Sequence, residues 1–450
     1  MSAYAPSLAH REAGGEACSA FRARVLRWRR QSLALCGAAQ FERAAPRGVG
    51  LLCLELDSAE QRLLLAGAAD GSVALFDTGS AAGLDGGSAR AGPPVAVPAA
   101  LRLRRGVAHA HGCSAAAWYP AGGGLCFTAG LDGCIKAWDL AAGGAEALRF
   151  SAGASKVYAL ALPRSASAPH GLLAAGVSDG RVLLCDPAAG GAAHVLTGHR
   201  AAVLCAAWLP ASEHVLATGG ADGAVRLWDV RTAGTLLLLD QHRTAEGGTG
   251  GGASALVGGD ASATVALAGA ATAHTGSVSA LCTSSDGRVL YSHGGDGRVR
   301  AWCAARGVNL LLHFPAAATP NAARLGTRLA LSGDGAALYV PARSGAAVLC
   351  ARTGDLLSPP LQGGHFADVV AAVAHPTTAA VFTAAQDGTV LTWAPRPLSS
   401  EADHAAATGQ RAGGAREDAD AWSDEEEAGR GPRMAYRPAA RTAGAQRHHA

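Results

Sequence analysis

The chain has 450 residues, of which 49% are hydrophobic and 16% are charged, and its formal net charge is +3. This much apolar material supplies a sizeable core and excludes a wholly disordered chain. The balance of 38 basic against 35 acidic residues excludes the strong positive field that drives nucleic-acid binding. The sequence contains no uninterrupted apolar run of about 18 residues, so we expect no membrane span. The 11 cysteines form no C-x-x-C pair, which argues against a zinc ribbon or a thioredoxin-type site, and we expect neither a metal nor a cofactor. An odd, scattered set of cysteines without a signal peptide fits a reducing compartment.

The N-terminal segment, residues 1–44, lies outside the repeats described below. Residues 21–36 read FRARVLRWRRQSLALC, in which Phe21, Val25 and Trp28 follow a helical stride among arginines. This pattern predicts a short amphipathic helix with a basic face. Three interpretations stay open: docking in a partner's groove, packing on the chain's own fold, or a transit peptide.

A short repeat runs through residues 45–395. It reads ADGSVALFD at residues 69–77 and returns as LDGCIKAWD, SDGRVLLCD, ADGAVRLWD, GDGRVRAWC and QDGTVLTWA. A period of about 43 residues relates these copies. A degenerate seventh copy, ARSGAAVLC at residues 342–350, fills the longest interval, and Gly-rich inserts near residues 79–98 and 241–272 lengthen two others.

Each Asp-Gly in the repeat predicts a hairpin turn between alternating strands. Four short strands per repeat make one propeller blade. Seven blades close a ring, which leaves no long exposed sheet edge. The sequence therefore predicts an all-β, seven-bladed propeller.

Four repeats carry a second pattern around the Asp-Gly turn. A histidine stands 21 to 23 residues before the aspartate, a Ser or Thr four before it, and a tryptophan six after it. The four sets are His111, Thr128, Asp132 and Trp138; His199, Thr218, Asp222 and Trp228; His274, Ser292, Asp296 and Trp302; and His365, Thr383, Asp387 and Trp393. Ser/Thr, His and Asp are also the groups of a catalytic triad. A nucleophilic site occurs once, however, whereas this set recurs with the repeat, so we interpret the sets as structural tetrads and expect no enzyme.

The C-terminal residues 396–450 are rich in Ala, Gly, Arg and acidic residues, a composition that predicts a disordered tail. Within it, EDADAWSDEEE at residues 417–427 sets Trp422 beside Asp424 and Glu425. This island is either a short linear motif for a basic surface or a solvated acidic run.

The tetrads, with LTGH at residues 196–199 and LWD at residues 227–229, resemble WD40 repeats. Several segments, in their order and residue sequence, are similar to those of the Cockayne syndrome group A family. They are WYP at 118–120, HVLTGHRAAVLCAAWLP at 194–210, LATGGADGAVRLWDVR at 216–231 and the acidic island. The members of that family are WD40 substrate receptors of cullin-4 RING ubiquitin ligases. The resemblance is weakest in the sixth blade and the N-terminal segment.

The resemblance implies a receptor without chemistry of its own. In that family a W-D-x-R box on the propeller's bottom face binds the ligase adaptor, the large subunit of the damaged-DNA-binding protein. Here the box consists of Trp228, Asp229 and Arg231. The N-terminal helix would make the second adaptor contact, through Phe21, Val25, Leu26 and Trp28.

The partners implied by the resemblance are this adaptor, cullin-4 and its RING subunit through the adaptor, the Cockayne syndrome group B ATPase, and RNA polymerase II stalled at a DNA lesion. The setting would be transcription-coupled nucleotide excision repair in the nucleus, with no direct nucleic-acid or membrane contact. A generic WD40 scaffold in chromatin or RNA processing, outside any ligase, is the alternative.

Overall fold

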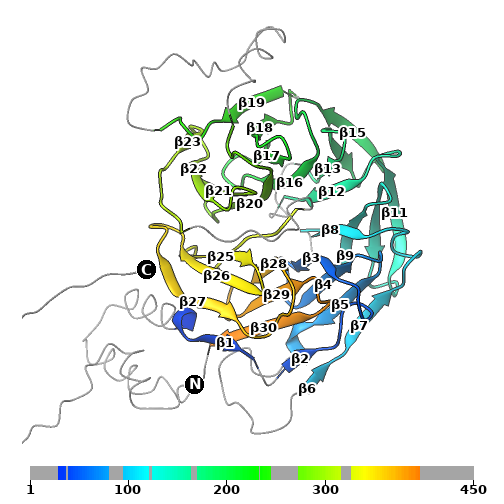
Figure 1. Ribbon diagram of the computed structural model, residues 1–450. Coiled ribbons are helices and arrows are strands. Elements are labelled where there is room, and N and C mark those ends of the chain that lie inside the picture. Colours follow the sequence, from blue (N-terminus) through cyan, green and yellow to red (C-terminus); the bar gives the residue numbers. More distant parts are fainter. Residues whose placement is uncertain are drawn as a thin grey trace, which may run out of the picture.

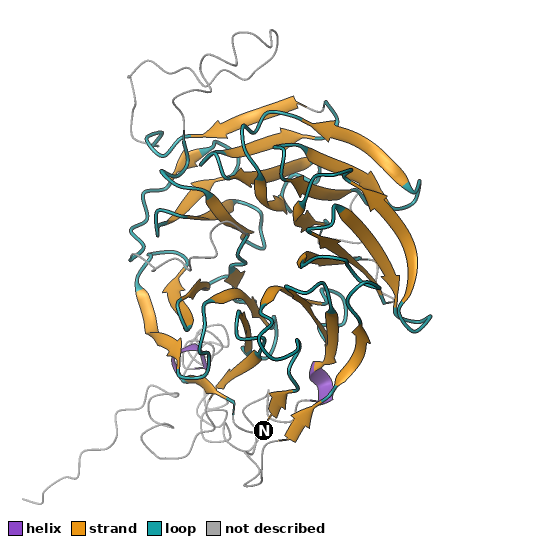
Figure 2. Ribbon diagram, turned by 45° about the vertical axis from the view of Figure 1, so that its right-hand side comes forward, coloured by secondary structure: helices purple, strands orange, loops and turns teal. Residues whose placement is uncertain are grey.

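The structure, a computed structural model, describes residues 29–36, 39–80, 95–120, 124–163, 170–232, 234–244, 272–315 and 326–395. Within these ranges, seven four-stranded antiparallel sheets surround one axis and form a ring (Figure 1). Figure 2 shows that strands make up nearly all of this ring; the described helical parts are the turn before β1 and the 3-10 turn Thr78–Ser80. The prediction of a seven-bladed, all-β propeller is confirmed.

Each blade is a meander in which the first strand lies nearest the axis. The blades consist of β3 (Leu51–Leu56), β4 (Leu63–Ala68), β5 (Val73–Asp77) and β7 (Ala99–Leu103); β8 (Cys113–Trp118), β9 (Leu125–Gly130), β10 (Cys134–Asp139) and β11 (Ala145–Ser151); β12 (Val157–Ala161), β13 (Leu173–Val177), β14 (Val182–Asp186) and β15 (Gly191–Leu196); β16 (Val203–Trp208), β17 (Val215–Gly220), β18 (Val225–Asp229) and β19 (Gly234–Leu239); β20 (Val278–Thr283), β21 (Val289–Gly294), β22 (Val299–Cys303) and β23 (Val308–Asn309); β24 (Ala330–Leu331), β25 (Ala337–Ala342), β26 (Gly345–Cys350) and β27 (Leu356–Gln362); and β28 (Val369–Ala374), β29 (Val381–Ala385), β30 (Val390–Pro395) and β1 (Leu33–Leu35).

The last blade is completed by a strand from the beginning of the chain. β1 pairs antiparallel with β30, with Leu33 opposite Pro395 and Leu35 opposite Trp393. Both ends of the ring therefore meet in one sheet, and β28 also contacts β3 of the first blade. The predicted start of the propeller at residue 45 is thus too late, because the closing strand lies within the segment that was placed outside the ring.

A second strand of the N-terminal segment packs on the rim. β2 (Ala39–Phe41) pairs in parallel with β6 (Val95–Val97), which comes from the predicted insert at residues 79–98. The Phe41 ring lies 5.1 Å from that of Phe76 in the first blade and 6.0 Å from that of Phe382 in the seventh, measured between centroids. Aromatic pairs at such distances stabilise a fold beyond the contribution of the apolar area that they bury. This segment therefore also joins the first and last blades.

The Asp-Gly turns need their glycines. Gly133 and Gly223 both have φ of 76°, in the left-handed region that favours glycine. A Cβ on Gly223 would lie 2.6 Å from the carbonyl oxygen of His274, in the loop that enters the next blade. Each turn is therefore packed against its neighbour around the ring.

Successive strands run in opposite directions, so the loops fall on two faces. The top face is formed here by the Asp-Gly turns and the loops that enter each blade, at residues 43–50, 104–112, 152–156, 197–202, 272–277 and 363–368. The bottom face is formed by the turns that follow the first and third strands of each blade, which include Arg62, Arg231, Arg306, Asp334 and Arg352. No helix among the described residues is long and apolar enough to cross a membrane.

Candidate protein-interaction site

The four repeated sets of side chains form hydrogen-bonded chains inside their blades. In blade 4, the Trp228 indole N–H donates to Thr218 Oγ1 at 2.7 Å, and Thr218 Oγ1 lies 2.8 Å from His199 Nε2. His199 Nδ1 lies 3.1 Å from both carboxylate oxygens of Asp222. The structure brings together His274, Ser292, Asp296 and Trp302 in blade 5, and His365, Thr383, Asp387 and Trp393 in blade 7, in the same way.

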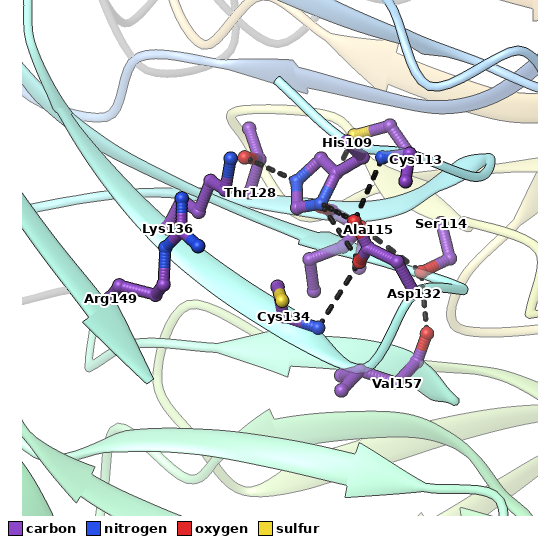
Figure 3. Close-up of polar contacts among 12 residues, drawn as sticks. His109, Cys113, Ser114, Ala115, Thr128, Asp132, Cys134, Lys136, Arg149 and Val157 are labelled. Carbon is purple, nitrogen blue, oxygen red and sulfur yellow. Dashed lines mark hydrogen bonds and ion pairs between the residues drawn. The ribbon is translucent and has the colours of Figure 1, made fainter. Parts of the chain in front are cut away.

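In blade 2 the predicted histidine is wrong: His109, not His111, completes the set (Figure 3). His109 Nε2 lies 2.8 Å from Thr128 Oγ1, and Nδ1 lies 3.1 Å from Asp132 Oδ1, whereas the His111 side chain is exposed. The reason lies in the loop. Asp132 also accepts the N–H of Ala110, the residue after the histidine, just as Asp222 accepts the N–H of Arg200 after His199. Only the position two residues earlier satisfies both bonds.

Burial and hydrogen bonding fix the protonation of these groups. Burial lowers the pKa of His109 and His274, which favours neutral rings. The neutral His109 ring donates from Nδ1 to Asp132 and accepts at Nε2 from Thr128. Burial alone would raise the pKa of Asp222, but the bonds from His199 and from backbone N–H groups outweigh it and hold that pKa below its ordinary value. The carboxylates therefore stay ionised.

The tetrads have no atom free to react with a substrate. The hydroxyls of Thr128, Thr218, Ser292 and Thr383 lie on residues that are 0% exposed. Each accepts from its tryptophan and faces its histidine, so the geometry stabilises the blade and offers no nucleophile. One supporting position was missed from the sequence: a Cβ on Gly220, two residues before Asp222, would lie 2.6 Å from His199 Nδ1.

The W-D-x-R box divides between the interior and the bottom face. Trp228 is buried within its tetrad, so its prediction as a contact residue is wrong. Asp229 ends β18, and its carboxylate accepts Arg231 Nε at 3.0 Å and Arg231 Nη2 at 2.6 Å. The Arg231 side chain is 64% exposed, whereas that of Asp229 is 9% exposed. The hydrogen bonds from Arg231 lower the pKa of Asp229, so this aspartate holds a charged guanidinium out toward solvent.

A second arginine fork on the bottom face was not predicted. Asp77 ends β5 of the first blade as Asp229 ends β18, and it accepts Arg62 Nε at 2.8 Å and Nη2 at 2.5 Å. Arg62 lies 15 residues earlier, in the turn after β3, so no contiguous motif marks the pair.

The described chain enters the ring on the bottom face. Arg30 is buried and pairs with Asp334 in the first turn of blade 6, and Leu33 follows at the lower end of β1. The predicted helix anchors Phe21, Val25, Leu26 and Trp28 lie outside the described residues, as do Trp422, Asp424 and Glu425 of the tail. Residues 29–31 are helical, so a helical turn does precede β1. The described residues contain no group of three metal-ligating side chains.

These features define a WD40 β-propeller, a class of fold that typically binds other proteins and is typically non-catalytic. The family model of the WD domain, G-beta repeat, matches residues 190–229 and 269–303. The chain is also 30% identical over 432 residues to WD repeat-containing protein ATCSA-1 of Arabidopsis thaliana, across 86% of this chain and 94% of that relative. The chain belongs to the WD repeat protein family.

Proposed function

We propose that this chain is a substrate receptor of a cullin-4 RING ubiquitin ligase and acts in transcription-coupled nucleotide excision repair in the nucleus. The observation that carries the proposal is the exposed Arg231, held by Asp229 on the bottom face. The resemblance to the Cockayne syndrome group A family supports the choice of partner, the large subunit of the damaged-DNA-binding protein.

The fork suits Arg231 for a docking contact. Nε and Nη2 face Asp229, so Nη1 and the outer edge of the planar guanidinium face solvent. Arginine is always charged and presents its donors in a rigid plane, which suits carboxylate and carbonyl acceptors on a partner. Because Asp229 fixes the plane, less side-chain entropy is lost on binding.

The course of the N-terminal segment supports one shared docking surface. The chain meets the ring on the bottom face at Arg30, so residues before it start from the same face as Arg231. In the proposed complex, the helix with Phe21, Val25, Leu26 and Trp28 binds the adaptor beside the ring. Asp229 and Arg231 provide the contact from blade 4.

The proposed mechanism has no chemical step in this chain. The receptor holds a target near the ubiquitin donor that cullin-4 and its RING subunit carry, and it raises the target's effective concentration there. The proposed targets are the Cockayne syndrome group B ATPase and proteins at stalled RNA polymerase II.

Affinity purification of the tagged chain from cells with stalled transcription tests this function. We expect mass spectrometry to find the adaptor and cullin-4 with the wild-type chain, and to find both strongly reduced with Arg231→Glu. Arg343→Glu on the top face is the matched control and should retain them. Wild-type chain without adaptor and cullin-4 would support the alternative, a scaffold in chromatin or RNA processing.

A further inference from the structure

The top face separates its charges by depth. Four of its aspartates, Asp132, Asp222, Asp296 and Asp387, are half-buried and bind the tetrad histidines. Asp179 on the turn of blade 3 is exposed, and it pairs with Arg181. The four half-buried aspartates also accept backbone N–H groups of the entering loops, for example that of Arg200 at 3.0 Å. These four carboxylates therefore already accept hydrogen bonds from groups of the protein itself, and they point inward.

The basic side chains of the same face point outward. Those that are exposed and form no ion pair with a described residue are Arg43, Arg47, Arg104, Arg105, Lys156, Arg200, Arg298 and Arg343. They come from loops and turns of nearly every blade, so they surround the axis. Such a ring of unpaired cations forms a positive surface despite a chain net charge of only +3.

Two large apolar side chains are exposed on this positive face, Val107 in the loop at residues 104–112 and the aromatic Phe366. Phe366 is 96% exposed and directly follows the tetrad histidine His365. Its backbone is fixed, because its N–H donates to Asp387 Oδ2 at 3.0 Å. An exposed aromatic ring on a fixed backbone, on a face that also carries cations, suits a ligand that combines an aromatic group with acidic groups.

The chain itself carries a segment of that chemistry. Residues 417–427 contain a single tryptophan, Trp422, no basic residue, and the acidic residues Glu417, Asp418, Asp420, Asp424, Glu425, Glu426 and Glu427. The 21 residues between Pro395 and Glu417 reach about 70 Å when extended, whereas a six-residue strand spans about 20 Å. The linker is thus long enough for the segment to reach the top face.

We propose that the top face is the docking site of this chain's own acidic segment, residues 417–427, with Trp422 against Phe366 and the carboxylates along the arginine ring. Tethering gives such a segment an effective concentration of about 1 mM, so individually weak ion pairs suffice. The docked segment covers the face opposite Arg231, and this inference does not depend on the ligase proposal.

Carbodiimide coupling in the full-length chain tests the docking, because the chain has only two lysines, Lys136 and Lys156. Carbodiimide joins a carboxylate to a nearby amine as an amide. Lys136 is 5% exposed and unreactive, whereas Lys156 is exposed on the top face. In a Lys156→Arg background, single lysine reporters are placed on the top face by Arg200→Lys or Arg343→Lys, and on the bottom face by Arg306→Lys or Arg352→Lys.

We expect residues 417–427 to couple several-fold more to the top reporters than to the bottom ones. β30 ends on the bottom face, so an unbound tail would couple more to the bottom reporters. A preference for the top reporters is therefore the opposite of what an unbound tail would give. In 1 M NaCl, where the Debye length is about 3 Å, the preference should vanish. In a separate series that keeps the native Lys156, Phe366→Ala and Arg104→Glu with Arg105→Glu should reduce the coupling to Lys156, and Arg306→Glu with Arg352→Glu should not.

The proposal fails if bottom reporters couple as well as top ones in low salt. A mixture of ¹⁵N-labelled and unlabelled chain identifies the occupant. Amides within one chain support docking of the chain's own segment, whereas amides only between labelled and unlabelled chains overturn it.

Discussion

Arg231 and Asp229 form a two-point fork at the end of β18, with Nε 3.0 Å from Oδ1 and Nη2 2.6 Å from Oδ2. An exposed pair of this kind contributes about 0–1 kcal/mol to stability. Its geometry therefore matters for what Arg231 presents to a partner more than for the fold.

The fork gives a first prediction. Arg231→Lys keeps the charge but loses the planar donor set, and Asp229→Asn loosens the guanidinium. Both variants should weaken adaptor binding in calorimetry while their unfolding midpoints stay close to wild type. Arg231→Glu should weaken binding by about 30-fold, which corresponds to a hot-spot loss of about 2 kcal/mol. Wild-type affinity in Arg231→Glu contradicts the role of the fork.

The two histidines of the second entering loop give a matched pair of variants. His109→Ala leaves the buried Thr128 hydroxyl and Asp132 without their partner, so it should destabilise the protein by about 2–3 kcal/mol in urea unfolding. His111→Ala removes an exposed side chain and should change stability by less than about 0.5 kcal/mol. Equal effects of both substitutions on stability would contradict the assignment of His109 to the tetrad of blade 2.

Buried His293 makes stability depend on pH. Burial lowers its pKa from 6.5 to about 4; Nδ1 lies 3.2 Å from Ser279 Oγ, and Nε2 has no hydrogen-bond partner among the described residues. Between these values the unfolded chain binds the extra proton, so stability is full above about pH 6.5 and falls as the pH drops toward 4, by at most about 1.4 kcal/mol per unit. Urea titrations at several pH values should show this slope, and His293→Gln should flatten it. His111→Gln is the control that should leave it unchanged.

The closing strand predicts where truncation becomes costly. Deletion of residues 1–28 leaves β1 intact, so the ring should fold with a near wild-type unfolding midpoint. Deletion of residues 1–44 removes β1 and β2 and exposes the edge of β30, so it should lower the midpoint markedly and promote aggregation. Differential scanning calorimetry of both truncations decides the point, and an unaffected 1–44 deletion would show that the ring closes without β1.

The repeat made most of the ring predictable. The Asp-Gly turns and alternating strands are local signals, and fixed spacing around Asp222, Asp296 and Asp387 identified three tetrads correctly. The degenerate copy at residues 342–350 corresponds to β26 (Gly345–Cys350), which shows that strand pattern and period survive the loss of the aspartate.

The features that were missed depend on contacts between distant parts of the chain. β1 pairs with β30 across the whole sequence and carries no Asp-Gly turn, so no period reveals it. The choice between His109 and His111 depends on the loop conformation that places Ala110 N–H on Asp132. The burial of Trp228 follows from its bond to Thr218, which competes with the surface role that the W-D-x-R box suggested.

Hydrogen–deuterium exchange of the full-length chain, with and without the purified large subunit of the damaged-DNA-binding protein, tests the central claim most directly. We predict protection on the bottom face, in the turn that contains Arg231 and in the residues that lead into β1, with unchanged exchange in the top-face loop at residues 363–368. Protection of the top-face loops instead, or no protection at saturating adaptor, would contradict the account.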